Sequence, residues 1–266
     1  MNAKTVRIAN ILAAILLLLN AGCILLNLVL SLFQLASFAI SLPAGIFLCL
    51  ALVLPTIVLL IVGIKQAKRK QGVFDLIAAI ATLLVGVVWT VASLLDWGLS
   101  IAQSVIINQY YAMDIDIPLG QILSILSYVY IAYTLLTIIV ALYLLIVYAV
   151  SVLRSKQKWL QIKAELHKLA VAVVILVPGL LYFVRLVLNR IMMTVSMEAY
   201  STYSMIAMYV QYGVSILLPI AAAVLLLTFG LILKKQTAPK ESVAQPEQPA
   251  PVADIDLPAG VSADDL

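Results

Sequence analysis

Long apolar stretches, separated by short segments that carry charges, dominate the pattern of this chain. There are six, at residues 8–33, 39–64, 73–96, 121–151, 169–188 and 207–233. Each is long enough for a helix to cross a hydrocarbon core of about 30 Å. The runs are continuous rather than alternating, and backbone polar groups within a membrane need internal partners, so helices are expected and a β-barrel is not. The pattern predicts an all-α polytopic membrane protein, with residues 1–235 forming a bundle of six transmembrane helices.

Composition agrees with this class. Of the 266 residues, 65% are hydrophobic and 11% are charged, whereas soluble domains are about 25% charged. A soluble enzyme domain is therefore excluded. Residues 236–266 differ from the rest because prolines and acids replace the apolar residues. We expect them to form a disordered acidic tail.

The basic residues predict how the helices are oriented. If the N-terminus is cytoplasmic, 13 of the 15 Lys and Arg residues before position 236 lie in cytoplasmic segments, and Arg185 and Arg190 do not. Positive charge gathers on the cytoplasmic side of membrane proteins. Both termini are therefore predicted to be cytoplasmic, in the plasma membrane, with anionic lipid as a partner at that face.

Two segments between the predicted spans are intermediate in polarity. Residues 97–113 are predicted to be an interfacial helix on the outer side. Residues 154–168 are amphipathic and basic, so they either lie at the headgroup level or extend the fifth span inward. His167, the one histidine, is interpreted as a solvated residue of this cytoplasmic segment.

Polar residues inside the first span share one helix face. Asn20 and Asn27 belong to a series with spacings of three and four residues, which also contains Cys23, Ser31 and Gln34. Buried amides need partners. The face is thus directed at other helices or at water, and it serves either a solute path or interhelical hydrogen bonds.

Prolines lie near the predicted midplane of two spans. Pro55 is ten residues before Lys65, and Pro178 is ten residues after Lys168. A proline frees a carbonyl group and kinks a helix, and interrupted helices in corresponding positions of inverted halves indicate a transporter binding site. Asn20, Asn27, Pro55 and Pro178 form the candidate solute path, although proline is also common in ordinary membrane helices.

Ionisable residues within or near the spans are few. Asp96 with Arg185 or Arg190 is a candidate outer ion pair, and the alternative is that each anchors its helix at the interface. Asp75, in the first turn of the third span, is interpreted as structural because the helix dipole there favours an anion.

Three further patterns concern packing and the outer side. Small residues recur every four positions at Ala78, Thr82, Gly86 and Thr90, which predicts close helix packing. Ten of the 12 tyrosines lie in the predicted outer half, where they form an aromatic belt or line a vestibule. Four methionines, which are candidate ligands for a soft metal or simply fill gaps, are Met193, Met197, Met205 and Met208.

No sequence motif of a hydrolase, nucleotide-binding or zinc site is present, so we expect no enzyme, no cofactor and no nucleic-acid partner. Two function classes remain open. One is a transporter or channel for a small neutral or weakly polar solute. The other is a non-transporting organiser or accessory subunit that acts through helix packing, with a membrane-protein partner or a second copy of the chain.

Overall fold

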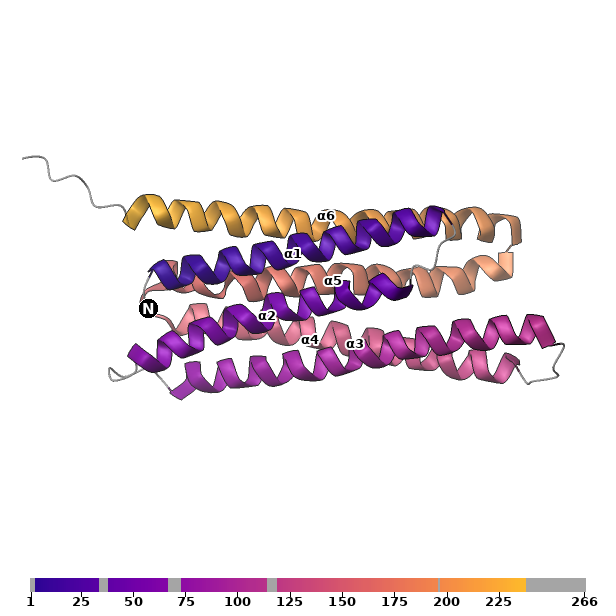
Figure 1. Ribbon diagram of the computed structural model, residues 1–266, viewed down its shortest axis with the longest axis horizontal. Coiled ribbons are helices and arrows are strands. Elements are labelled where there is room, and N and C mark those ends of the chain that lie inside the picture. Colours follow the sequence, from indigo (N-terminus) through magenta and orange to yellow (C-terminus); the bar gives the residue numbers. More distant parts are fainter. Residues whose placement is uncertain (1–2, 34–37, 67–72, 114–118, 196, 238–266) are drawn as a thin grey trace, which may run out of the picture.

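Six long helices make up the described part of the chain. The computed structural model describes residues 3–33, 38–66, 73–113, 119–195 and 197–237 and shows an elongated bundle (Figure 1). The helices are α1 (Ala3–Leu32), α2 (Phe38–Gln66), α3 (Val73–Met113), α4 (Leu119–Arg154), α5 (Lys158–Val195) and α6 (Met197–Thr237). Positions 238–266 of the predicted acidic tail lie outside the described residues.

The six helices form a closed ring. Each helix packs against the next along the chain, and α6 returns to pack against α1. In addition, α5 contacts both α1 and α2 across the ring, so it contacts four helices. The start of α1 and the end of α6 lie at the same end of the bundle, which we call the terminal end (Figure 1). At the opposite end, the far end, the α3–α4 and α5–α6 hairpins extend beyond α1 and α2 (Figure 1).

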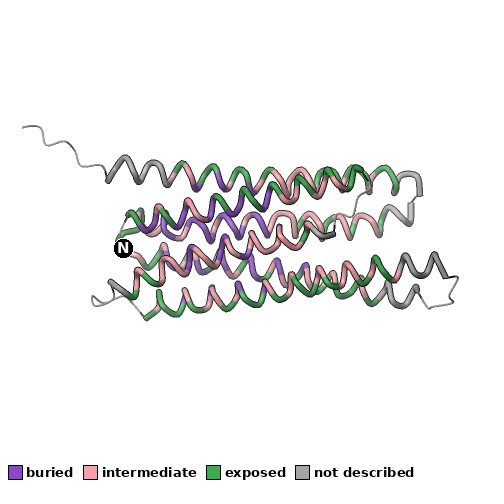
Figure 2. Tube along the Cα trace, in the orientation of Figure 1, coloured by how far each residue is buried: buried purple, intermediate pink, exposed green. Residues whose placement is uncertain are grey.

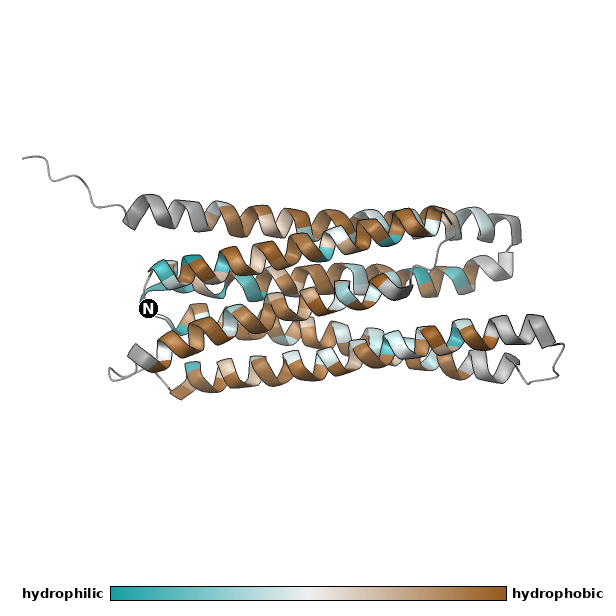
Figure 3. Cartoon of the chain, in the orientation of Figure 1, coloured by the Kyte–Doolittle hydropathy of each residue, from teal (hydrophilic) through white to brown (hydrophobic). Residues whose placement is uncertain are grey.

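All six helices are long and apolar enough to cross a membrane. This confirms the six long apolar helices that the sequence predicts, while their insertion in a membrane and the orientation of the termini stay predictions. Apolar residues are distributed along every helix (Figure 3). Many large ones face outward, such as Leu84, Ile139 and Leu217, which are 62–66% exposed. An apolar outer surface over the length of a bundle is what a lipid environment requires.

Tight packing is concentrated in the half of the bundle nearer the terminal end, where most buried residues gather (Figure 2). Many are alanines; Ala9, Ala13, Ala14, Ala170 and Ala172 are each at most 6% exposed. Small side chains let helix backbones approach closely. Towards the far end the bundle is looser, and intermediate and exposed residues predominate (Figure 2).

The predicted small-residue face of α3 does pack closely. A Cβ atom built at Gly86 would lie 2.6 Å from Cγ2 of Val53 on α2, which is too close for two carbon atoms. Thr82 is fully buried, and its hydroxyl donates to the carbonyl oxygen of Ala78 at 2.7 Å. Helix packing therefore accounts for this face.

Two predictions about the helix ends are wrong. Residues 97–113 are not a separate interfacial helix, because α3 continues through them to Met113 without a break. His167 is not solvated: it is fully buried within α5, with Nε2 3.2 Å from Oγ1 of Thr56 on α2. The basic segment before residue 169 extends α5 inward from Lys158, as one of the two alternatives states. Three of its polar residues, Lys163, His167 and Lys168, are buried where α1 and α2 pack against α5.

Candidate solute-binding cavity

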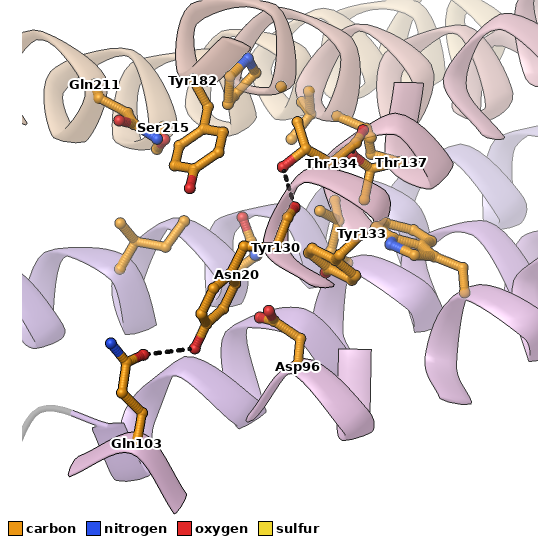
Figure 4. Close-up of a pocket in the computed structure, with 17 residues that line it drawn as sticks. Asn20, Asp96, Gln103, Tyr130, Tyr133, Thr134, Thr137, Tyr182, Gln211 and Ser215 are labelled. Atoms are coloured by element: carbon orange, nitrogen blue, oxygen red, sulfur yellow. Dashed lines mark hydrogen bonds between the residues drawn. The ribbon is translucent and has the colours of Figure 1, made fainter. Parts of the chain in front are cut away.

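A cavity of about 610 Å³ lies inside the looser half of the bundle. All six helices contribute to its walls: Asn20 and Ile24 of α1, Leu48 of α2, Trp89, Asp96 and Gln103 of α3, Tyr130, Tyr133, Thr134 and Thr137 of α4, Val174, Ile175, Pro178, Gly179 and Tyr182 of α5, and Gln211 and Ser215 of α6. Its volume lies within the range of small-molecule sites, which is about 300–1,000 Å³. Apolar residues form much of the wall, and a limited set of polar groups converges on the space (Figure 4).

The α3 wall is a polar stripe. Trp89, Asp96 and Gln103 are seven residues apart and all line the cavity. Ser93 and Ser100 lie between them, so the stripe has spacings of four and three residues and occupies one helix face. Ser93 and Ser100 each hydrogen-bond a carbonyl oxygen of their own helix at 2.9 Å. Their hydroxyls are thereby fixed towards α4.

Tyrosines of α4 complete the contact with this stripe. The hydroxyl of Tyr130 donates to Oε1 of Gln103 at 3.1 Å and lies 3.2 Å from Oγ of Ser100. The hydroxyl of Tyr133 lies 3.4 Å from Oγ of Ser93. These bonds hold both rings in place at the cavity wall (Figure 4).

Asn20 lines the cavity from α1, as the predicted solute path requires. It is 2% exposed, and its Nδ2 donates to the backbone oxygen of Ala44 on α2 at 2.7 Å. Its Oδ1 is buried and has no hydrogen-bond partner among the described residues. A buried amide oxygen without a donor is unfavourable. Asn20 therefore joins two helices at the cavity wall and keeps one amide oxygen without a hydrogen-bond donor among the described residues.

Pro178 also lines the cavity. Because proline has no N–H, the carbonyl oxygen of Val174, four residues earlier and also in the wall, loses its donor within α5. At the adjacent Gly179, a Cβ would make van der Waals contact with α4, 3.4 Å from Cγ1 of Ile138 and 3.6 Å from Oγ1 of Thr137. Pro178 thus leaves a backbone acceptor, the carbonyl oxygen of Val174, at the cavity wall.

The other two residues of the predicted path do not line the cavity. Pro55 is fully buried in α2, next to Thr56 and the His167 contact. Asn27 is half-buried on α1, and its Oδ1 has no hydrogen-bond partner among the described residues. Asn20 and Pro178 are therefore the two members of the set that the structure brings together.

The candidate outer ion pair does not form within the described residues. Asp96 lines the cavity, whereas Arg185 donates from Nη1 to Oε1 of Gln211 on α6 at 3.1 Å. The glutamine amide takes the place of the expected carboxylate, and it joins α5 to α6. The side chain of Arg190 lies outside the described residues.

The methionine candidates are only partly described. Met205 and Met208 are exposed on α6, at 54% and 36%, and the side chains of Met193 and Met197 lie outside the described residues. Within the described part of the chain, no three His, Cys, Asp or Glu side chains are grouped so that they could hold a metal ion.

A second set of buried polar groups closes the terminal end of the bundle. Nδ2 of Asn10 on α1 donates to the backbone oxygen of Lys163 on α5 at 2.9 Å, and both side chains are at most 1% exposed. Nζ of Lys163 lies 4.8 Å from the ring centroid of Trp159, a cation–π contact. One turn further along α5, His167 contacts Thr56. These contacts join α1 and α2 to α5, and none of the residues that make them lines the cavity.

Several cavity residues escape the sequence analysis. Thr134 and Thr137 on α4 look scattered until Tyr130 and Tyr133 are placed on the same face, at helical spacings of three and four. Gln211 and Ser215 on α6 are also four residues apart. The sequence pattern that could have identified these cavity residues is a helix face of amides, hydroxyls and tyrosines within an apolar run. This face is recognised only if tyrosine is counted as a polar residue.

Comparison of the chain with models of protein families, with curated protein sequences and with solved structures finds no match in any of the three.

Proposed function

We propose that this protein is a transporter or channel, and not an enzyme, which moves a small polar solute across a membrane by way of the central cavity. The observation that carries the proposal is the cavity itself, which all six helices line and which exposes amide, hydroxyl and carboxylate groups inside an otherwise apolar bundle. Packing alone accounts for the small-residue face of α3, but it leaves Oδ1 of Asn20 without a partner.

The depth of the cavity supports this function. Asn20 is 17 residues from the start of α1, and a rise of 1.5 Å per residue places it about 25 Å along the helix. Polar groups at such depth in a membrane line an aqueous space or meet one another. In the proposed orientation the contacts of Asn10 and His167 lie between the cavity and the cytoplasmic end of the bundle.

Water access to the cavity is the first test. In a background of Cys23→Ala and Cys49→Ala, Ser215→Cys places a thiol on the cavity wall, and Leu217→Cys places one on the outer face two residues away. A charged methanethiosulfonate reagent modifies thiols only where water reaches them. We expect Ser215→Cys to react in sealed vesicles and Leu217→Cys not to react. Ser201→Cys, exposed near the start of α6, is the positive control.

Flux is the second test. Proteoliposomes containing the full chain are mixed with a hyperosmotic solution of a small polar solute, so that they first shrink. Swelling of the vesicles as the solute enters is followed by light scattering. Ser215→Trp fills the cavity and is expected to abolish solute-dependent swelling, whereas Leu217→Trp changes only the outer surface and leaves it intact. A thiol at position 215 that stays unreactive, together with no flux, refutes transport and favours the accessory-subunit alternative.

A further inference from the structure

We infer that the cavity recognises a small organic solute through an ammonium group, which pairs with the carboxylate of Asp96 among aromatic rings. This inference rests on the proposed function, because it names the chemistry of the solute that the same cavity takes. It begins from the charge of the wall. Of the 17 residues that line the cavity, Asp96 alone carries a formal charge.

The carboxylate of Asp96 has no compensating partner within the described residues. Its backbone oxygen accepts from Ser100, but no hydrogen-bond donor or cation among them engages its side chain. Arg185, the expected partner, donates to Gln211 instead and does not line the cavity. Asp96 is half-buried, and a carboxylate partly withdrawn from water gains stability when a cation pairs with it. Figure 4 shows Asp96 directed towards the tyrosines of α4.

Four aromatic rings stand around the same space. Trp89 comes from α3, Tyr130 and Tyr133 from α4, and Tyr182 reaches in from α5 on the opposite wall (Figure 4). The faces of such rings attract cations, and aromatic walls are the usual means of holding alkylated ammonium groups. The rings of Tyr130 and Tyr133 are fixed by their bonds to α3. They add attraction for a cation without providing a competing hydrogen-bond donor for Asp96.

The ammonium group has two possible sources, a simple organic cation or the positive end of a zwitterion. Four probes of nearly equal shape separate them. Choline carries the trimethylammonium group with a neutral hydroxyl, and glycine betaine carries it with a carboxylate. The carbon isosteres 3,3-dimethyl-1-butanol and 3,3-dimethylbutanoate have the same outlines with no positive charge. Any preference within a pair is therefore due to the ammonium charge.

Binding is measured with the purified full chain in lipid nanodiscs. The chain has three tryptophans, so Trp97→Phe and Trp159→Phe leave Trp89, in the cavity wall, as the fluorescent reporter. We expect at least one ammonium probe to bind at least tenfold more tightly than its carbon isostere. Tighter binding of choline identifies a free cation as the ligand class, and tighter binding of betaine identifies a zwitterion; either supports the inference.

Matched substitutions test the assigned groups. Asp96→Asn keeps the shape but removes the charge, and it should abolish the preference for the ammonium probe. Asp75→Asn removes the same charge from an exposed site on the same helix and should leave the preference intact. Tyr182→Leu should weaken ammonium binding at least threefold, while Tyr182→Phe, which retains a ring, should not. If Asp96→Asn fails to fold, the comparison of Tyr182→Leu with Tyr182→Phe still tests whether the cavity binds an ammonium group.

Two outcomes overturn the inference. If the carbon isosteres bind as tightly as the ammonium compounds, the charge of Asp96 does not select the ligand, although a water-accessible Ser215→Cys would still leave the cavity in use. If no probe changes the fluorescence of Trp89, the cavity does not recognise an ammonium group. An unreactive thiol at position 215 would show in addition that the proposed function itself fails.

Discussion

Replacing Gly86 by alanine tests how closely α2 and α3 approach each other. The added methyl group would lie 2.6 Å from Cγ2 of Val53. Valine cannot easily turn this carbon away, because β-branched side chains keep one preferred rotamer in a helix. Either the helices separate or the valine takes a strained rotamer. Since α3 carries Asp96 and Gln103, a shift of this helix would also displace one wall of the cavity.

The expected magnitude is a difference between two terms. Overpacking of a fitted contact costs about 1–3 kcal/mol. Alanine gains about 1 kcal/mol over glycine within a helix. Gly86→Ala should therefore change the free energy of unfolding by between about 0 and 2 kcal/mol in the destabilising direction. At Gly22 and Gly213 a Cβ meets nothing within 4 Å, so alanine there should be neutral or stabilise by up to about 1 kcal/mol.

A double-mutant cycle with Val53→Ala isolates the steric term. The smaller residue removes the carbon that alanine at position 86 would strike, so the two changes together should be about 1–3 kcal/mol less destabilising than the sum of the single changes. Unfolding is followed in mixed detergent micelles by the fluorescence of tryptophan, since Trp89 is buried one turn away. Additivity within about 0.5 kcal/mol would refute the close contact.

Three further predictions follow from the buried polar groups. Asn20→Ala should destabilise the bundle by about 1 kcal/mol because it removes the bond to the α2 backbone; no loss in the same unfolding assay would contradict that bond. Asn10→Ala should cost a similar amount through its bond to Lys163, and the two losses should be additive because the sites are about 15 Å apart along α1. His167, the one histidine, should resist diethyl pyrocarbonate in the folded protein and react after denaturation, as read by mass spectrometry. Modification of the native protein would show that the α5 contact with Thr56 is open.

The six long apolar helices could be predicted because they depend on local composition. Six apolar runs separated by charges suffice, and each corresponds to a helix that is long and apolar enough to span a membrane. The helix ends could not be predicted in the same way. Polar residues after position 96 and before position 169 resemble interfacial or loop sequence, but α3 and α5 continue through them. Some polar groups there contact neighbouring helices, such as Gln103 with Tyr130 and His167 with Thr56, and a single sequence does not show these neighbours.

His167 illustrates this difference. Surrounded by lysines in the sequence, it is typical of a solvated segment. In the folded chain its ring lies 3.2 Å from Thr56 and 3.1 Å from the carbonyl oxygen of Ala164, so both ring nitrogens lie within hydrogen-bonding distance of an oxygen inside the bundle. The contact joins residues 111 positions apart. Such a pair cannot be inferred from the spacing within one helix.

The candidate site was only partly visible for a related reason. Asn20 and Pro178 stand out as polar or helix-breaking residues within apolar runs, and both line the cavity. Asn27 and Pro55 meet the same criterion but lie elsewhere in the bundle. Depth along a helix can be counted from the sequence, whereas the direction in which a side chain faces depends on how the helices pack.

The sizes of the buried residues explain why the cavity lies where it does. In the half near the terminal end, alanines such as Ala13 and Ala14 meet at the helix contacts, and the backbones close together. In the other half, Tyr130 and Tyr133 of α4 line the cavity instead. Hydroxyl contacts with α3 then hold the rings against the wall instead of letting them fill the space. Small residues therefore pack the half near the terminal end, whereas hydrogen-bonded tyrosines line the cavity in the other half.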